Sequence, residues 1–158
     1  SGQTDELAVL APERLLRRMT VEAGGRIGVE GQLRSYNNKS GQGSRLVITT
    51  FARTLCRGGE EDCNEIRLSG VLCKPPVLRC TPLGREICDL MLAVNRSYGR
   101  ADYIPCIAWG GLAEETSLLG VGDPLSFEGR VQSRLYHKMT PRGQEDRTAY
   151  EVSVMCLR

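Results

Sequence analysis

The chain has 158 residues, of which 41% are hydrophobic and 25% are charged, so it can form one large or two small packed domains. Its net charge of +2 is only weakly basic and gives little support by itself for a nucleic-acid partner. Seven cysteines, no apolar leader segment and no apolar run of 18 residues argue against a secreted disulfide-linked or membrane-spanning chain, and we expect a cytoplasmic protein.

Residues 1–56 predict a strand near Asp5, a helix and two further strands, the last of them over 44–53 (SRLVITTFAR). The apolar residues of these segments are expected to be buried: Leu7, Val9, Ile27, Val29, Leu33, Leu46 and Ile48. The glycine-rich, acidic stretch CRGGEEDC that follows predicts a linker over 57–63.

Residues 64–158 predict a complete unit of five strands and one short helix. Strands are expected at 65–73, 85–95, 102–109, 124–136 and 148–156, and the helix at 110–118. The stretches PPVLRCTPLG, RSYGRA and HKMTPRGQEDR predict the turns between strands. Phe127 has the parity of a core residue, and strand positions favour burial of Cys88, Cys106 and Cys156.

The two units repeat one another. TDELAVLAPERL aligns with ADYIPCIAWGGL when Asp5 is set against Asp102, and GGRIGVEGQLRS aligns with GDPLSFEGRVQS. The first unit therefore holds counterparts of the third strand, the helix and the last two strands, and it lacks the two opening strands.

Five strands with a helix between the third and fourth are the arrangement of the OB-fold, a small and partly open barrel. We therefore predict an all-β chain in which a complete OB-fold barrel at 64–158 follows a partial OB-fold unit at 1–56. OB-folds bind oligonucleotides, sugars and proteins, so topology alone leaves the ligand open.

Four aromatic residues of the complete unit favour an oligonucleotide as the ligand. Tyr103 and Trp109 share one face of a strand, opposite an apolar face, while Tyr136 lies on a charged strand face and Tyr98 lies in the connection RSYGR. Rings beside cations suit stacking of bases while the cations hold phosphates. Packing at a barrel edge or a subunit interface is the alternative. The cations expected at phosphates are Arg96, Arg100, Arg130, Arg134, Lys74 and Lys138.

The sequence favours neither a metal site nor an enzyme. The cysteines form no C-x2-C pair, and the one histidine, His137, lies far from them in a turn sequence without a nucleophilic partner. No glycine-rich stretch continues into G-K-[ST], so no phosphate loop is present. We expect no cofactor, no metal and no catalytic residue.

Residues 64–158 resemble the bacterial single-stranded DNA-binding protein family. The resemblance rests on NEIRLSGVLCKPPVLRCTPLGREICDLMLAVNRSY, DYIPCIAWGGLAEE, GDPLSFEGRVQSRLY and TAYEVSV. It implies an OB-fold and base stacking at Tyr98, Tyr103, Trp109 and Tyr136, three of them tyrosine where tryptophan is more usual in that family.

The motifs GQLRSYNN (31–38) and LCKPP (72–76) are similar to motifs of a two-barrel version of that family found in Firmicutes, with the start of the first barrel missing here. Family members often associate so that four barrels meet, which implies a homodimer or higher assembly for a two-barrel chain. The half-unit would then serve mainly as scaffold. Members also often carry an acidic tail that recruits replication and repair enzymes, whereas this chain stops at VMCLR.

The function expected from the residues and the resemblance is non-specific binding of single-stranded DNA in replication, recombination or repair, at the nucleoid. The alternative is an OB-fold module for protein interaction or assembly without significant DNA binding.

Overall fold

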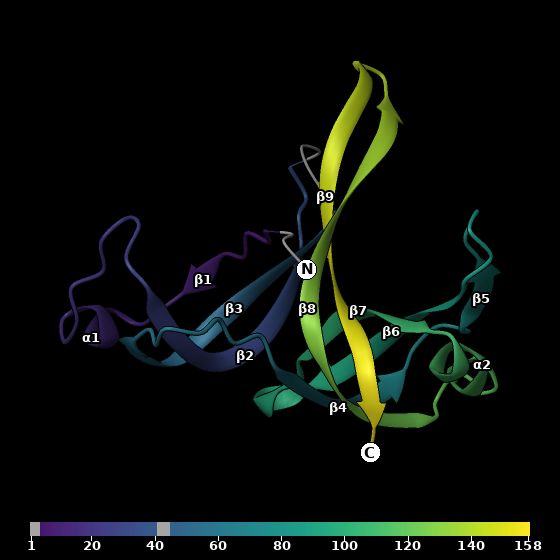
Figure 1. Ribbon diagram of the computed structural model, residues 1–158, viewed down its shortest axis with the longest axis horizontal. Helices are drawn as coiled ribbons and strands as arrows, with labels where there is room; N and C mark the ends of the chain where they lie inside the picture. The colour runs from purple at the N-terminus through teal and green to yellow at the C-terminus, as the bar shows by residue number, and fades with distance from the viewer. Residues whose placement is uncertain (1–3, 41–44) are drawn as a thin grey trace.

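The computed structural model describes residues 4–40 and 45–158, which form two β-sheets (Figure 1). The first sheet has the order β1–β3–β2 and the second the order β4–β8–β9–β7–β6–β5. The strands are β1 (Val9–Leu10), β2 (Ile27–Asn37), β3 (Leu46–Arg57), β4 (Ile66–Leu72), β5 (Val77–Cys80), β6 (Glu86–Asn95), β7 (Ala101–Trp109), β8 (Pro124–Thr140) and β9 (Gly143–Leu157). The helices are α1 (Glu13–Leu16), the 3-10 turn η1 (Ser97–Gly99) and α2 (Gly111–Ser117).

The second sheet closes into a barrel. β4 pairs along its length with β8 and, at Val71 and Leu72, with β6. β7 pairs with β9 in parallel, and α2 lies between β7 and β8 in the chain. This is the strand pairing of an OB-fold, so the predicted all-β OB-fold class is confirmed.

Large apolar side chains fill the barrel. Phe127 is 1% exposed, as its strand parity predicted, and it packs in one cluster with Leu72, Leu92, Ile104 and Val152. Alternate residues of each strand point to this interior. The outward residues include exposed ones, such as Tyr103, and buried ones, such as Ile107 and Ser153.

Two of the three strand cysteines are buried as expected, Cys88 and Cys106, but Cys156 is exposed. The register between β8 and β9 shifts at Glu128/Gly129, which leaves Met155 as an extra residue. A β-bulge of this kind reverses the alternation beyond it, so Cys156 lies opposite Glu128 on the outside. The expectation that Cys156 is buried was wrong.

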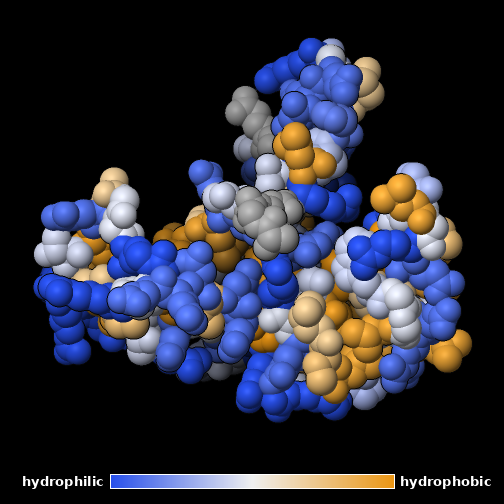
Figure 2. All heavy atoms as spheres, viewed as in Figure 1, coloured by the Kyte–Doolittle hydropathy of each residue, from blue (hydrophilic) through white to orange (hydrophobic). Residues whose placement is uncertain are grey.

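Two segments read as turns contain strand. The stretch PPVLRCTPLG contains β5, which pairs with β6, and most of HKMTPRGQEDR extends the hairpin of β8 and β9. The extension runs in register from Tyr136↔Arg147 to Thr140↔Gly143, where Gly143 adopts a positive φ of 110°. Polar residues suit this hairpin because it projects from the barrel (Figure 1), and its surface is mostly hydrophilic (Figure 2).

The first unit is less well buried than its sequence predicted. Ile48 is buried, but Val9 is 40% exposed and Ile27 is 39% exposed. Their counterparts in the repeat, Cys106 and Leu125, are 2% and 7% exposed. The barrel covers those two with strands for which the first sheet has no counterpart, so the prediction that Val9 and Ile27 are buried was wrong. The predicted strand 44–53 appears as β3, and residue 44 lies outside the described residues.

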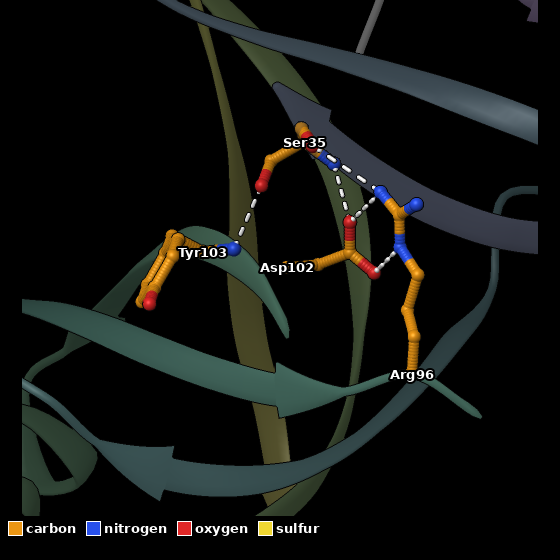
Figure 3. A network of polar contacts seen from close by, with 4 residues as sticks. All are labelled: Ser35, Arg96, Asp102 and Tyr103. Carbon is orange, nitrogen blue, oxygen red and sulfur yellow. Dashed lines mark hydrogen bonds and ion pairs between the residues drawn. The ribbon is translucent and has the colours of Figure 1, made fainter. Parts of the chain in front are cut away.

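A buried polar network joins the first unit to the barrel (Figure 3). The backbone N–H of Ser35 on β2 donates to Asp102 Oδ1 at 2.8 Å, and the backbone N–H of Tyr103 donates to Ser35 Oγ at 2.7 Å. Arg96 donates to both carboxylate oxygens of Asp102, at 2.5 and 2.7 Å. Burial would raise the pKa of the Asp102 carboxyl, but the bonds from Arg96 and Ser35 and the nearby charge of Arg34 hold that pKa below its ordinary value.

A second, equivalent contact joins the two units, with the aspartate now in the first unit and the serine in the barrel. Ser133 of β8 donates both its N–H, at 2.8 Å, and its hydroxyl, at 2.5 Å, to Asp5 of the first unit. These bonds hold the pKa of Asp5 below its ordinary value. Asp5 is the counterpart of Asp102, and Ser133 is the counterpart of Ser35. Each unit therefore offers an aspartate to the serine of the other, which is the reciprocity of a two-fold interface within one chain.

Candidate functional site

Tyr103 and Trp109 lie on the outward face of β7, because Ile104, Cys106 and Ala108 on the other face are buried. Tyr103 is 46% exposed, and Trp109 is half-buried at the end of the strand. The guanidinium of Arg85 lies over the Trp109 ring, 4.7 Å from its centre. This cation–π contact covers one face of the Trp109 ring and helps to hold the ring in place.

Strand parity did not find Arg85, since its contact with Trp109 runs between strands. The register pairs Ile87 of β6 with Trp109 of β7, which brings the residues at the start of β6 to the end of β7. Only the pairing of the two strands reveals this contact.

Tyr98 is fully exposed in the short connection between β6 and β7. The backbone N–H of Arg96 donates to the carbonyl of Arg100 at 2.7 Å and closes this connection into a tight loop. Tyr98 has a φ of 67°, which is uncommon for a bulky residue with a Cβ. The loop therefore holds a large ring in solvent at the cost of an unfavourable backbone conformation. Backbone strain of this kind is common at binding sites.

The remaining predicted residues lie mainly along β8. Arg130, Arg134, Tyr136 and Lys138 share the outward parity of that strand. β9 separates β8 from β7, and Ser153 pairs on one side with Arg130 and on the other with Ile107. The outward residues of β7, β9 and β8 thus form one continuous sheet face, here called the outer face.

The six predicted cations differ in whether they already form ion pairs with carboxylates of the protein. Arg96 is committed to Asp102, and its side chain is only 24% exposed. Arg134 lies 3.5 Å from Glu151 but remains half exposed. In the described part of the chain no ion pair engages the exposed residues Arg100, Arg130, Lys74 and Lys138. Lys74 follows β4, whose end pairs with the start of β8 at Val71↔Pro124, whereas the three cations of β8 lie further along that strand, from Arg130 onward.

Residues 4–40 and 45–158 contain neither a metal-holding cluster nor a membrane-spanning helix. No cluster of three or more His, Cys, Asp or Glu side chains in 4–40 and 45–158 is able to hold a metal ion. None of the helices in these ranges is long and apolar enough to cross a membrane.

Known proteins resemble this chain in both sequence and structure. Residues 63–157 match the model of the single-strand binding protein family. Single-stranded DNA-binding protein B of Bacillus subtilis is 39% identical over 80 residues, which cover 46% of this chain and 71% of that protein. The single-stranded DNA-binding protein of Bacillus cereus is 34% identical over 99 residues, which cover 58% of this chain and 55% of that protein.

Among solved structures, the wild-type single-stranded DNA binding protein from Thermus aquaticus superposes with a TM-score of 0.68 at 30% identity. The match covers 88% of this chain and 61% of that one, so it extends through the first unit as well as the barrel. This chain spans little more than half the length of several relatives that it matches. Since the family model matches well over half of the residues, the chain belongs to the single-strand binding protein family.

Proposed function

We propose that this protein binds single-stranded DNA without sequence specificity, by stacking bases on the outer face of its barrel. The observation that carries the proposal is the placement of Tyr103 and Trp109 on one outward strand face, with Tyr98 fully exposed in the loop that precedes that strand. Every base has a face that stacks on an aromatic ring, so such a surface accepts any sequence.

Phosphates would be held by the cations beside these rings. Arg100, Arg130, Arg134 and Lys138 are exposed and suit this role, with Lys74 further away along the chain. Arg96 suits it less, because its guanidinium is bound to the buried Asp102, and we assign it to the joint between the units. Stacking and phosphate contacts together are how single-strand binding proteins without base readout hold their ligand.

The residue most worth testing is Trp109. Replacement by alanine should weaken binding to oligothymidylate by about 1–3 kcal/mol, the usual contribution of one stacked base. Trp109→Phe is the matched control, since it keeps a ring and should retain most of the affinity. Equal binding by a folded Trp109→Ala variant and the wild type would remove Trp109 from the binding site.

We further propose that residues 1–56 form a partial OB-fold unit and residues 64–158 a complete OB-fold domain of one cytoplasmic, nucleoid-associated protein. We also propose that this protein assembles as a homodimer or higher symmetric oligomer and takes part in DNA replication or repair. Support comes from the uncovered apolar residues of the first sheet, Val9, Leu10 and Ile27 among them. Exposed apolar surface next to open strand edges favours association. Light scattering tests this directly, since a monodisperse monomer at high concentration would contradict it.

A further inference from the structure

Two carboxylates lie on the barrel face that carries Trp109. Asp89 of β6 pairs in register with Ile107 of β7, so its side chain lies on the same side of the sheet as Trp109, two residues further on. Glu151 of β9 pairs with Gln132 of β8 on the outer face. Asp89 is half-buried, and Glu151 is only 6% exposed. Negative charge on this face opposes the approach of a polyanion such as DNA, so the partners of these carboxylates matter for binding.

Each carboxylate is held by an arginine. Arg79 of β5 donates its Nε to Asp89 Oδ2 at 2.6 Å and its Nη2 to Asp89 Oδ1 at 3.3 Å. Arg134 Nε of β8 lies 3.5 Å from Glu151 Oε2, and Gln132 Nε2 donates to Glu151 Oε1 at 2.9 Å. The two negative charges are therefore compensated within the protein itself.

Arg79 lies close to the proposed stacking surface. It pairs in register with Ile87 of β6, and Ile87 pairs with Trp109 of β7, so the three residues share one row across the sheet. Two strand spacings amount to about 10 Å. A hydrogen bond to Asp89 raises the pKa of Arg79 against the effect of burial, and the charges of Asp89 and Glu151 raise it further. Both carboxylates therefore act on this one guanidinium.

Neither ion pair is closed to a competitor. The side chain of Arg79 is 41% exposed and that of Arg134 is 53% exposed. Ion pairs of such exposed side chains contribute little to stability, because water screens them. A DNA phosphate presents oxygens that a guanidinium binds in the same forked arrangement as a carboxylate. Each arginine is therefore able to exchange its carboxylate for a phosphate.

We infer that Asp89 and Glu151 occupy Arg79 and Arg134 when the protein is free, and that phosphates of single-stranded DNA displace them. The inference rests on the proposed function and adds to it a competitor within the protein. It also adds Arg79 to the cations at phosphates, a residue that lies in a stretch read as a turn from the sequence. Because the displaced carboxylates stay on the binding face, they lower the affinity of the complex.

The test measures the affinity of the whole chain at low salt for an oligothymidylate of about 15 nucleotides, a length that one OB-fold covers. Asp89→Asn keeps the size of the side chain and removes its charge. It should bind about fivefold more tightly than the wild type, which corresponds to about 1 kcal/mol, the energy of two unit charges about 4 Å apart in water. Asp62→Asn is the matched control, because Asp62 also lies 2.6 Å from an arginine, Arg26, but in the linker. It should bind like the wild type.

A double-mutant cycle with Arg79→Gln separates competition from simple repulsion. A carboxylate that competes for Arg79 weakens binding more when Arg79 is present, whereas a carboxylate that only repels DNA has the same effect in both backgrounds. The gain in affinity from Asp89→Asn should therefore be at least about twofold larger with Arg79 than with Arg79→Gln, the lower limit for residues in contact.

Nitrogen NMR of the arginine side chains tests the exchange in the wild-type protein, without any substitution. The Nε–H signals of Arg79 and Arg134, which face the two carboxylates, should shift when the oligothymidylate is added. The Nε–H signal of Arg26, which donates to the carbonyl of Gly59 in the linker, should not. This measurement decides the matter if a variant does not fold.

Equal gains from Asp89→Asn in the two backgrounds, or unshifted Nε–H signals of Arg79 and Arg134 at saturation, would overturn the inference and leave the proposed function intact. An equal gain from Asp62→Asn would overturn it too, since the effect would then follow from net charge alone. If the wild-type protein does not bind the oligothymidylate, the proposed function itself fails.

Discussion

Asp102→Asn is the substitution that tests the joint between the two units most sharply. The change keeps the shape of the side chain and removes its charge. Asp102 is buried, and its carboxylate receives two bonds from Arg96 and one from Ser35. The asparagine amide cannot accept on both sides, so Arg96, whose side chain is 24% exposed, keeps a charge without a counterion.

Removing one partner of a buried ion pair costs 3–5 kcal/mol, and the partial exposure of Arg96 places this case near the lower end, at about 3 kcal/mol. Asp5→Asn is the matched control, because Asp5 occupies the equivalent position in the repeat and receives bonds from Ser133, while no arginine among the described residues donates to it. An asparagine oxygen is still able to accept from Ser133, so that variant should lose only about 1 kcal/mol, the difference between a charged and a neutral acceptor.

Amide hydrogen exchange measures this contrast residue by residue. In Asp102→Asn the backbone N–H groups of Ser35 and Tyr103, which both donate within the joint, should exchange much faster than in the wild type. In Asp5→Asn the Ser133 N–H should change only slightly. Equal exchange of Ser35 in Asp102→Asn and the wild type would refute the reasoning, and so would a larger loss of stability in Asp5→Asn.

Three further predictions concern stability. Phe127→Ala should lower the free energy of unfolding by about 3–5 kcal/mol in urea titrations, because it empties the centre of the barrel core, and an unchanged midpoint would contradict that placement. Gly129→Ala should cost about 1–3 kcal/mol, since a Cβ there would lie 2.1 Å from the carbonyl oxygen of Ser153, and thermal melting that matches the wild type would show that the bulge relaxes. The pKa values of Asp5 and Asp102 are lowered in the folded protein, so these two groups stabilise it fully above about pH 3.9, the unfolded value. Their contribution to the free energy of unfolding is lost as pH falls through the folded pKa values. Amide exchange of Ser35, corrected for intrinsic rates, should therefore be constant from about pH 7 to 5 and should rise below about pH 4.

The sequence alone predicts most of the barrel, because apolar and polar residues alternate along its strands and turn-forming residues lie at the strand ends. Phe127 and the order of five strands around α2 follow from that pattern. The projecting hairpin does not, since its proline, glycine and charged residues are typical of a turn, and only the pairing from Tyr136↔Arg147 onward makes them strand.

Burial in the first unit could not be predicted from periodicity. Alternation shows which face of a strand is apolar. Whether Val9 and Ile27 on that face are buried depends on which strands lie beside them. The repeat had matched Asp5 with Asp102 without revealing that each binds a serine of the other unit. The alternation of residues along one β-strand placed Tyr103 and Trp109 on the same face. The contact of Arg85 with Trp109 could be found only from the register between two strands.

The most direct test of the account is a titration of the wild-type protein with oligothymidylate, followed through the emission of Trp109, the only tryptophan in the chain. We predict that the emission is quenched on binding, that affinity falls as salt rises with a slope of about −0.7 for each phosphate neutralised, and that duplex DNA of equal length competes poorly. A saturating oligonucleotide that leaves the emission of Trp109 and the mass of the protein unchanged at low salt would contradict it.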